Sequence, residues 1–439
     1  MNSYDLIVIG SGPGGYATAA TAAAMGRRVA IVERDLLGGT CLNRGCIPTK
    51  ALCRSAEMAL MMPKAQSLGV NIDGYSLDYS AAAERKNSVT DTLREGVATV
   101  LKDVEVLHGN ARITSGDTIE VNGELYQARQ IIIATGSRPA TLNIPGAELA
   151  MDSDRMLSAT TLPKSIAIIG GGVIGMEFAS ILNAFGVTVT VLEYCPEILP
   201  GFDEDVAKRL RMSLKRRGVS IVTGAAVTSI TPGCTVNYTA KNKEKNIDAE
   251  MVLTAVGRRA VLPEGLDAAG VATDDRGYII TDEKMATTAP GIYAVGDVNG
   301  RCMLAHAATA QGRVALGLHQ RLDVVPSAVF TTPECAMVGM TEQQCRDRGV
   351  AYRAGNAIYR ANGKAIAMDE PDGMVKILVD EQSDKILGCH ICGAHAADMV
   401  QEVAVAMSAG MGAGMLMATI HGHPTLSELI VDAVSKAMG

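Results

Sequence analysis

Short apolar runs that end in glycine and continue into a helical pattern occur twice along the chain. The first run, residues 4–9, leads into the glycine-rich segment 10–15, which reads GSGPGG. The second run, residues 165–169, leads into the segment 170–175, which reads GGGVIG. An apolar run, a glycine turn and a helical pattern in this order are typical of a strand–turn–helix unit of a parallel sheet. The pattern therefore predicts the same βα unit twice.

Each glycine-rich turn has the spacing GxGxxG, and an acidic residue closes the strand that follows. Glu33 and Glu193 lie 23 residues after the first glycine of their copy. In this motif the first glycine makes the turn, the second admits a pyrophosphate, and the third packs the helix on the strand. The acid accepts hydrogen bonds from a ribose. A glycine turn without a ligand could explain one copy, but two copies in the same context predict two bound dinucleotides.

Two dinucleotide sites in one chain indicate an enzyme that passes electrons between a flavin and a nicotinamide. At the second site the carboxylate of Glu193 would repel the 2′-phosphate of NADP. Tyr194, Cys195 and Pro196 follow it, where an NADP site would favour an arginine. We therefore expect FAD at one site and NAD at the other.

The pattern changes after about residue 325. Before that point, apolar runs at 130–134 and 292–295 each end in a glycine turn, which suits strands that close over a bound cofactor. Beyond it, runs at 326–330, 374–379 and 385–391 predict the strands of a separate α+β unit, which ends in a helix after residue 424. The expected fold class is α/β, with two Rossmann-like dinucleotide-binding domains and a C-terminal α+β domain.

Charge and composition narrow the function. The net charge of −7 and the isoelectric point near 5.6 argue against nucleic-acid binding, which usually needs a basic face. The uncharged stretch 403–420 contains glycines, a serine and a threonine, and predicts a buried helix and turn rather than a membrane span. The methionines at 407, 411, 415 and 417 suggest core or subunit-interface packing. The start of the sequence shows no targeting signal, so we expect a cytoplasmic protein with no membrane partner. Ten cysteines in such a chain are not expected to form structural disulfides.

Two cysteines stand out in the segment 38–50, which reads GGTCLNRGCIPTK. Four residues separate Cys41 from Cys46, and this pair without a second ligand pair is a poor match to a zinc site. In a regular helix their Cα atoms would lie at least about 7.5 Å apart, beyond the reach of a disulfide. Gly45 gives the backbone the freedom to distort, and Pro48 disfavours an uninterrupted helix. Unless the two cysteines are unrelated, the spacing predicts a strained, readily reduced disulfide.

A second candidate lies near the C-terminus, where residues 421–428 read HGHPTLSE. Because His423 precedes a proline, it is expected outside a helix with its ring free. Its imidazole could act as a general base toward a thiol, with Glu428 orienting it. The run Thr425–Glu428 equally matches a helix capping box, which needs no catalysis. The local sequence leaves both interpretations open. A metal site is not expected from Cys389, His390, Cys392 and His395, because Cys389 and Cys392 would point to opposite faces of a strand.

In this order the motifs resemble the pyridine nucleotide–disulfide oxidoreductases of the lipoamide dehydrogenase and glutathione reductase type. The resemblance covers essentially the whole chain. Besides GGTCLNRGCIPTK and the two glycine motifs, it rests on ATGSRP (134–139), GIYAVGD (291–297), FTTPE (330–334) and HPTLSE (423–428). Within this family, CLNRGCIPTKAL and IHGHPTLSE are most similar to the dihydrolipoamide dehydrogenase branch. The glycine- and methionine-rich stretch 409–417 departs from that branch, which puts the detailed surface of the dimer or complex in doubt.

The resemblance implies an NAD-dependent flavoenzyme that reoxidises dihydrolipoyl groups. A related NAD(P)H-dependent reductase of another disulfide, a metal ion or a quinone is the alternative. The implied partners are a second copy of the chain, in a homodimer, and a lipoyl-carrying protein of a 2-oxoacid dehydrogenase or glycine cleavage complex. The implied domains are an FAD-binding domain (1–140), an NAD-binding domain (141–260), a central segment completing the FAD domain (261–325) and an interface, or dimerisation, domain (326–439).

The resemblance also assigns roles to residues. Cys41 would meet the substrate and Cys46 would face the flavin, while His423, paired with Glu428, would serve the cysteines of the other subunit. Lys50 and Glu177 would form an ion pair beside the flavin and the nicotinamide. The FAD-binding residues would be Gly10, Gly12, Gly14, Gly15, Glu33 at the adenosine ribose, Gly39, Thr40, Lys50, Thr135, Gly136, Gly296, Asp297 at the flavin ribitol or phosphate, Met303, Leu304, Ala305 and His306. The NAD-binding residues would be Gly170, Gly172, Gly175, Glu177, Glu193 and Gly257.

Overall fold

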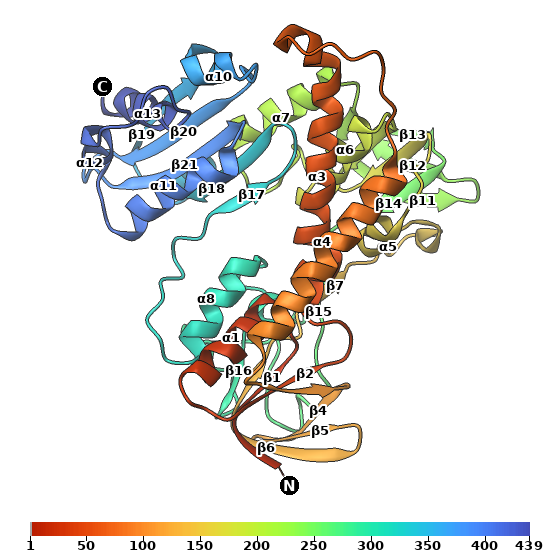
Figure 1. Cartoon of the computed structure of the whole chain (residues 1–439), viewed down its shortest axis with the longest axis vertical. Helices are drawn as coiled ribbons and strands as arrows, with labels where there is room; N and C mark the ends of the chain where they lie inside the picture. Colours follow the sequence, from red (N-terminus) through yellow and green to blue (C-terminus); the bar gives the residue numbers. More distant parts are fainter. Residues whose placement is uncertain (1) are drawn as a thin grey trace.

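The first glycine motif lies in a sheet of seven strands in the computed structural model, which describes residues 2–439 (Figure 1). The strand order is β3-β2-β1-β6-β5-β4, and β16 pairs with β6. Leu6, Ile7 and Val8 of the central strand are fully buried, as expected for a parallel strand covered on both faces. The strands are β1 (Asn2–Ile9), β2 (Val29–Glu33), β3 (Glu105–His108), β4 (Ala111–Ser115), β5 (Thr118–Val121), β6 (Glu124–Ile133) and β16 (Ile292–Ala294).

The second glycine motif lies in a smaller parallel sheet of order β10-β9-β8-β14. A three-stranded antiparallel sheet, β11-β12-β13, and a two-stranded ribbon, β7-β15, accompany it. The residues of the middle strand β12 alternate between buried and half-buried, the period of two expected when one face of a strand meets a core. The strands are β7 (Ser137–Pro139), β8 (Ser165–Ile169), β9 (Thr188–Glu193), β10 (Ser220–Thr223), β11 (Ala225–Thr231), β12 (Thr235–Ala240), β13 (Lys243–Asp248), β14 (Met251–Thr254) and β15 (Arg258–Ala260).

The C-terminal part is an antiparallel sheet of order β17-β18-β21-β20-β19 (blue in Figure 1). Its central strand β21 is buried along its whole length, and α11 and α13 pack on the sheet. The predicted strands at 326–330, 374–379 and 385–391 are therefore present. The strands are β17 (Ser327–Val329), β18 (Glu334–Gly339), β19 (Tyr352–Ile358), β20 (Met374–Asp380) and β21 (Ile386–Gly393).

Helices follow the glycine turns and cover the sheets. The long helices α3 and α4 run side by side across the centre of the molecule (Figure 1). The remaining helices are short or medium in length. Their bounds are α1 (Pro13–Ala24), α2 (Gly39–Arg44), α3 (Cys46–Met61), α4 (Tyr79–Val100), α5 (Ser153–Ser158), α6 (Val173–Ala184), α7 (Glu204–Arg216), α8 (Ala305–Ala315), α9 (Glu342–Asp347), α10 (Gly363–Ala367), α11 (Ala396–Ser408), α12 (Ala413–Ala418) and α13 (Glu428–Met438).

The uncharged stretch 403–420 is the end of α11, a turn and α12, so the predicted helix and turn are present, but half of these residues are exposed rather than buried. Within residues 2–439, no helix is long and apolar enough to cross a membrane. Met407 and Met411 pack against the C-terminal core. Met415 and Met417 are exposed on the single chain, so subunit-interface packing stays the prediction for them.

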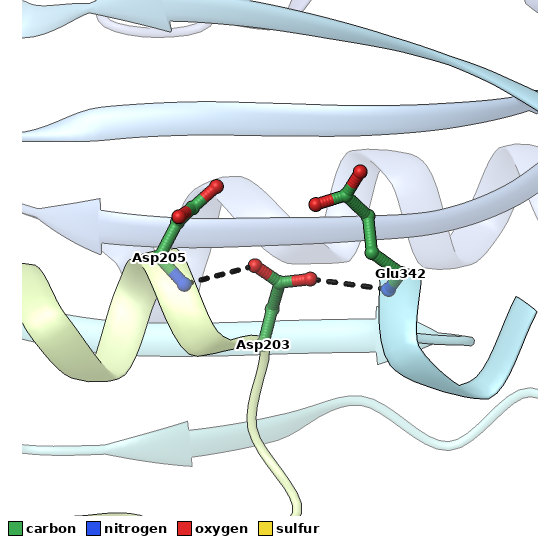
Figure 2. A group of neighbouring side chains, drawn as sticks. All are labelled: Asp203, Asp205 and Glu342. Carbon is green, nitrogen blue, oxygen red and sulfur yellow. Dashed lines mark hydrogen bonds between the residues drawn. The ribbon is translucent and has the colours of Figure 1, made fainter. Parts of the chain in front are cut away.

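A buried lysine joins the second dinucleotide unit to the C-terminal sheet. Lys376 of β20 is 1% exposed, and its Nζ lies 2.8 Å from Asp203, 2.5 Å from Asp205 and 2.6 Å from Glu342. Figure 2 shows the three carboxylates, with Asp203 accepting hydrogen bonds from the N–H groups of Asp205 and Glu342. The carboxylates are close enough to hold a metal ion, but the Lys376 ammonium already lies among them. Burial alone would lower the pKa of Lys376, but the hydrogen bonds to the carboxylates raise it above its usual value.

Replacing this lysine tests whether it holds the two parts together. We expect Lys376→Met to lower the free energy of unfolding by about 3–5 kcal/mol, because the buried Asp203 carboxylate loses its counter-ion. Denaturant unfolding followed by circular dichroism measures the change. The control is Lys208→Met, which breaks the exposed pair with Glu204 and is expected to leave the midpoint in place. An equal effect of both substitutions would contradict the role of Lys376.

Candidate active site

One cavity of about 2250 Å³ runs past both glycine turns and the cysteine pair. Most of the predicted cofactor residues line it. Gly15 and Gly175 do not belong to the described lining, and neither do His423 and Glu428. The predicted residues that line the cavity are Gly10, Gly12, Gly14, Glu33, Gly39, Thr40, Cys41, Cys46, Lys50, Thr135, Gly136, Gly170, Gly172, Glu177, Glu193, Gly257, Gly296, Asp297, Met303, Leu304, Ala305 and His306.

The glycines of the two turns have the same geometry in both copies. Gly10 and Gly170, with φ of +102° and +109°, adopt a backbone conformation that other residues rarely take. A Cβ on Gly15 would lie 1.9 Å from the carbonyl oxygen of Gly10, and the corresponding distance from Gly175 to Gly170 is 2.0 Å. The third glycine therefore lets the helix pack closely on the turn, as the motif predicted.

The second glycine of each turn leaves room for a ligand. Gly12 and Gly172 are the N-cap residues of α1 and α6, and no described atom lies within 4 Å of a Cβ built on either one. Both line the cavity, where the free N–H groups of a helix N-terminus favour an anion. The two cradles therefore fit the pyrophosphate groups of two dinucleotides.

The acid after each turn braces the turn itself. Glu33 accepts hydrogen bonds from the N–H of Ser11 at 2.9 Å and from its hydroxyl at 2.6 Å. Glu193 accepts one from the N–H of Gly171 at 2.5 Å and another from that of Cys195 at 2.6 Å. A carboxylate offers about four acceptor positions, so each acid keeps positions for a ribose. The sequence motif indicated the ribose but not this bond back to the turn.

The cysteine pair lies at a break between two helices. Cys41 belongs to α2, Cys46 is the first residue of α3, and Gly45 between the helices has φ −152° and ψ −113°. The predicted distortion of the backbone at Gly45 is therefore present. Both cysteines are free thiols in the structure, which corresponds to the reduced form of the pair.

The two thiols differ in acidity. A hydrogen bond from the Cys41 thiol and the charge of Lys50 outweigh burial and lower the pKa of Cys46 to about 7. The same hydrogen bond, together with burial, raises the pKa of Cys41. The position of Cys46 at the N-terminus of α3 also favours the anion. The thiolate of the reduced pair therefore resides on Cys46.

The ion pair expected between Lys50 and Glu177 joins α3 to α6. The Nζ of Lys50 lies 2.8 Å and 3.0 Å from the two carboxylate oxygens of Glu177, which is 4% exposed. The N–H of Phe330 donates a hydrogen bond to the same carboxylate at 2.9 Å, and the ammonium lies 4.6 Å from the centre of the Phe330 ring. Phe330 was not among the predicted site residues, since a backbone N–H leaves no signature in a sequence.

A second network at the cavity wall orients Asp297. The hydroxyl of Ser137 donates a hydrogen bond to the Asp297 carboxylate at 2.5 Å. Arg258 donates from Nε to the Ser137 hydroxyl at 2.7 Å and from Nη2 to the Ser137 carbonyl at 2.8 Å. Arg258 reaches Ser137 diagonally, because β15 pairs with β7 and Arg258 lies opposite Pro139, two residues from Ser137 on the same face. Neither residue was among the predicted site residues, because their contact depends on two strands that lie far apart in the chain.

At the C-terminus, Glu428 holds the turn that carries His423. One carboxylate oxygen lies 2.9 Å from Nδ1 of His423, and the other accepts a hydrogen bond from the N–H of Thr425 at 2.8 Å. The predicted capping box is not formed, because Ser427 is the N-cap of α13 and the Thr425 hydroxyl donates to the Gly422 carbonyl. These bonds, from Thr425 first and then His423, lower the pKa of Glu428. The His423 ring is 79% exposed.

A second histidine–carboxylate pair lies close by in the sequence and was not predicted. Nε2 of His421 lies 2.6 Å from Glu402 of α11, and Nδ1 lies 2.9 Å from the Thr419 carbonyl. The His421 side chain is only 10% exposed. Burial would lower the pKa of His421, but the bond to Glu402 raises it. This pair anchors the segment that carries His423.

One cavity therefore holds two dinucleotide cradles and a pair of neighbouring thiols, one of which is acidic. This arrangement suits the two-electron reduction and oxidation of disulfides. The chain belongs to the pyridine nucleotide–disulphide oxidoreductase family: the model of that family matches residues 4–312. The dimerisation domain of the same family matches residues 325–434, which supports the expected homodimer. The predicted family, fold class and cofactors, FAD and NAD, are confirmed. The predicted domain boundaries and site residues stay predictions.

Individual relatives point to one branch of the family. The chain is 39% identical over 452 residues to a dihydrolipoyl dehydrogenase of Geobacillus stearothermophilus, covering 99% of this chain and 96% of the relative. It is 38% identical to a dihydrolipoyl dehydrogenase of Staphylococcus aureus, covering 99% and 97%. The relatives thus carry the enzyme name that the sequence motifs predicted.

A solved structure gives a second comparison. The HOCl-induced flavoprotein disulfide reductase RclA from Escherichia coli is 31% identical, with a TM-score of 0.87 over 98% of this chain and 99% of that one. Its Cu(II) complex gives a TM-score of 0.88.

The acidity of Cys46 can be measured in the reduced protein. We expect its alkylation rate to rise as the pH increases through about 7, because only the thiolate reacts. Lys50→Met removes a positive charge and shifts the midpoint to higher pH, while Glu177→Gln removes a negative charge and shifts it to lower pH. Iodoacetamide labelling followed by peptide mass spectrometry gives the rate at this residue alone. A midpoint near the usual thiol pKa of about 8.5, or shifts of the same sign, would contradict the assignment.

Proposed function

We propose that the chain is a dihydrolipoyl dehydrogenase that reoxidises dihydrolipoyl groups and delivers the electrons to NAD. The observation that carries the proposal is the cysteine pair: Cys41 and Cys46 line the same cavity as both dinucleotide cradles, and Cys46 holds the thiolate. The relatives at 38–39% identity bear this enzyme name. Glu193 at the second cradle favours NAD over NADP, because its carboxylate would repel a 2′-phosphate.

The residues of the chain act on the substrate in two displacement steps, starting from the oxidised Cys41–Cys46 disulfide. His423 takes a proton from one dihydrolipoyl thiol, and the resulting thiolate attacks the sulfur of Cys41. The disulfide breaks, and Cys46 leaves as the thiolate that its low pKa stabilises. The second substrate thiol then attacks the mixed disulfide, which closes the lipoyl disulfide and releases the Cys41 thiol. When bound, FAD carries the two electrons from the dithiol to NAD.

His423 and Glu428 would complete the site of the partner protomer in a homodimer. Among the described residues, neither lines the cavity of its own chain. The His423 ring is exposed and held by Glu428, so it is available to a neighbouring molecule. The match to a dimerisation domain over residues 325–434 supports this arrangement.

The lipoyl group would be presented by a carrier protein of a 2-oxoacid dehydrogenase or glycine cleavage complex. A dihydrolipoyl group swings on a carrier, and the enzyme that reoxidises it must accept it at an open cavity.

The cytoplasmic location also stays a prediction.

A substrate panel tests the proposed activity. The holoenzyme is assayed with NADH and with NADPH against lipoamide, glutathione disulfide, a quinone, mercuric ion and Cu(II). The Cu(II) arm is included because RclA was solved as a Cu(II) complex. We expect turnover with lipoamide and NADH to exceed every other combination. A preference for another acceptor would replace the proposed substrate, and a preference for NADPH would contradict the role of Glu193.

Loss of the histidine tests the proposed base. We expect His423→Gln to lower the rate of dihydrolipoamide oxidation by about 10²–10⁴-fold, the usual contribution of a positioned acid or base. Binding of NADH is expected to stay unchanged, since His423 lies outside the described cavity lining. Stopped-flow oxidation and NADH titration give the two quantities.

Mixed dimers then show which protomer supplies the base. His423→Gln and Cys46→Ser are each inactive, but random reassortment of the two chains gives heterodimers with one intact site if the base comes from the partner. About a quarter of the wild-type activity is then expected from an equal mixture, because half of the dimers are mixed and each has one working site. No recovery would place His423 at the cysteines of its own chain.

A further inference from the structure

Two cysteines outside the active site lie directly opposite each other in the C-terminal sheet. Cys335 of β18 and Cys392 of β21 are cross-strand partners in the antiparallel register. Both are fully buried. The proposed reaction uses neither of them.

The register fixes which kind of cross-strand pair they form. Cys335 and Cys392 face each other in a ladder that runs without a bulge from the pair Glu334–Gly393 to the pair Gly339–Gly388. Hydrogen-bonded and non-hydrogen-bonded pairs alternate along an antiparallel ladder, so one backbone bond of known position fixes the kind of every pair.

The far end of the ladder supplies that bond. The N–H of Met340 donates to the Leu387 carbonyl at 2.8 Å, so Met340 and Leu387 form a hydrogen-bonded pair. Cys335 lies five positions before Met340, and because this offset is odd, Cys335 and Cys392 occupy a non-hydrogen-bonded position. There the Cα atoms are about 4.5 Å apart and the side chains approach most closely. That separation falls within the Cα range of disulfides, about 4.4–6.8 Å.

The surroundings of this pair differ from those of the catalytic pair. Burial, and after it the neighbouring Cys392 thiol, raise the pKa of Cys335 well above its usual value. Both cysteines belong to the core cluster shared with the second dinucleotide unit, and the Thr331 side chain hydrogen-bonds to Cys335. The Cys335 thiol is therefore protonated, and both sulfur atoms are shielded in the closed sheet, so the pair reacts only when the sheet opens locally.

We propose that Cys335 and Cys392 are a second oxidisable dithiol, which forms a cross-strand disulfide when the protein meets a peroxide. Once the sheet opens, one cysteine thiol loses its proton and the thiolate attacks a peroxide oxygen; the O–O bond breaks, giving a sulfenic acid and hydroxide, and the hydroxide takes up the released proton to become water. The second thiol attacks the sulfenic sulfur; the S–S bond forms and a second water leaves. Two thiols are oxidised by two electrons, and one hydrogen peroxide is reduced to two water molecules.

The bond would fix the strand that follows the active-site segment. Phe330, whose N–H binds Glu177, lies five residues before Cys335, and the N–H of Thr332 donates to the Ser180 hydroxyl of α6. A link from Cys335 to the central strand β21 therefore anchors this segment to the C-terminal core. We expect the oxidised protein to melt at a higher temperature than the reduced protein, because the cross-link closes a long loop of the unfolded chain.

Peptide mapping of the peroxide-treated holoenzyme tests the proposal. The wild-type protein is incubated with hydrogen peroxide, denatured, alkylated with iodoacetamide and digested. We expect a cross-linked peptide pair containing Cys335 and Cys392 that appears more slowly than the Cys41–Cys46 link and disappears on reduction with dithiothreitol. The peroxide treatment is also repeated while the protein is warmed several times to a temperature below its melting transition, so that the sheet opens locally. If both residues are still fully alkylated after this treatment, the proposal is overturned. A link from either residue to Cys53 or Cys389 overturns it as well.

A matched variant separates this pair from buried cysteines in general. Cys389 lies on the same strand, is equally buried, and faces Val338 and Ile377 on the neighbouring strands. Cys389→Ala is expected to keep both the cross-link and the rise in melting temperature, while Cys392→Ala loses both. Equal behaviour of the two variants overturns the proposal. Should Cys392→Ala fail to fold, the peptide map of the wild-type protein still decides.

Discussion

The buried carboxylate of Glu177 is the constraint on which the arrangement of the site depends. A carboxylate taken out of water is costly unless charge and hydrogen bonds compensate it. Here the compensation comes from two directions, the Lys50 ammonium of α3 and the Phe330 N–H that leads into the C-terminal sheet. Cys46 lies four residues before Lys50, on the same face of α3. The ion pair and hydrogen bond that compensate the Glu177 carboxylate therefore also hold the Cys46 thiol in position beside the second dinucleotide unit.

The same physical solution recurs on the other side of that unit. There the charge sign is reversed: a buried lysine of the C-terminal sheet is surrounded by the carboxylates of Asp203, Asp205 and Glu342. The second dinucleotide unit is thus braced by one ion cluster toward the FAD-binding part and by another toward the C-terminal part. Replacing one member of either cluster would leave a buried charge without its partner, which is costly.

Local features of the chain were predictable because they depend on neighbours in sequence. The glycine turns, their acids, the apolar strands and the break at Gly45 all follow from the spacing of a few residues. The contacts of Phe330 and Arg258 did not follow, because each joins segments more than a hundred residues apart and one of them uses a backbone N–H. The hydrogen bond from Ser11 to Glu33 joins residues only 22 positions apart, but it forms only when the glycine turn has folded and brought Ser11 next to the carboxylate.

The C-terminal motif shows why a capping-box pattern need not form a cap. Glu428 has two carboxylate oxygens, and the fold gives one to the Thr425 N–H and the other to the His423 ring. The first contact is one that a capping box would make, but α13 begins at Glu428 with Ser427 as its N-cap, so Thr425 lies outside the helix end. The Thr425 hydroxyl donates to the Gly422 carbonyl, and these bonds hold the turn that carries His423. The residue at which the helix begins decides between the two outcomes, and the motif residues alone do not give it.

Two pairs of neighbouring cysteines, Cys41 with Cys46 and Cys335 with Cys392, differ in reactivity because their surroundings differ. Cys46 has a lysine of its own helix, a helix N-terminus and a cavity wall, which lower its pKa to about 7. Cys335 has the interior of a sheet, with apolar neighbours and a second thiol, which raise its pKa. The first pair is therefore poised for rapid exchange with a substrate in the cavity, whereas the second is kept from it by burial. A chain can hold both pairs without mixing them, because thiolate exchange requires both an ionised sulfur and an open path to it.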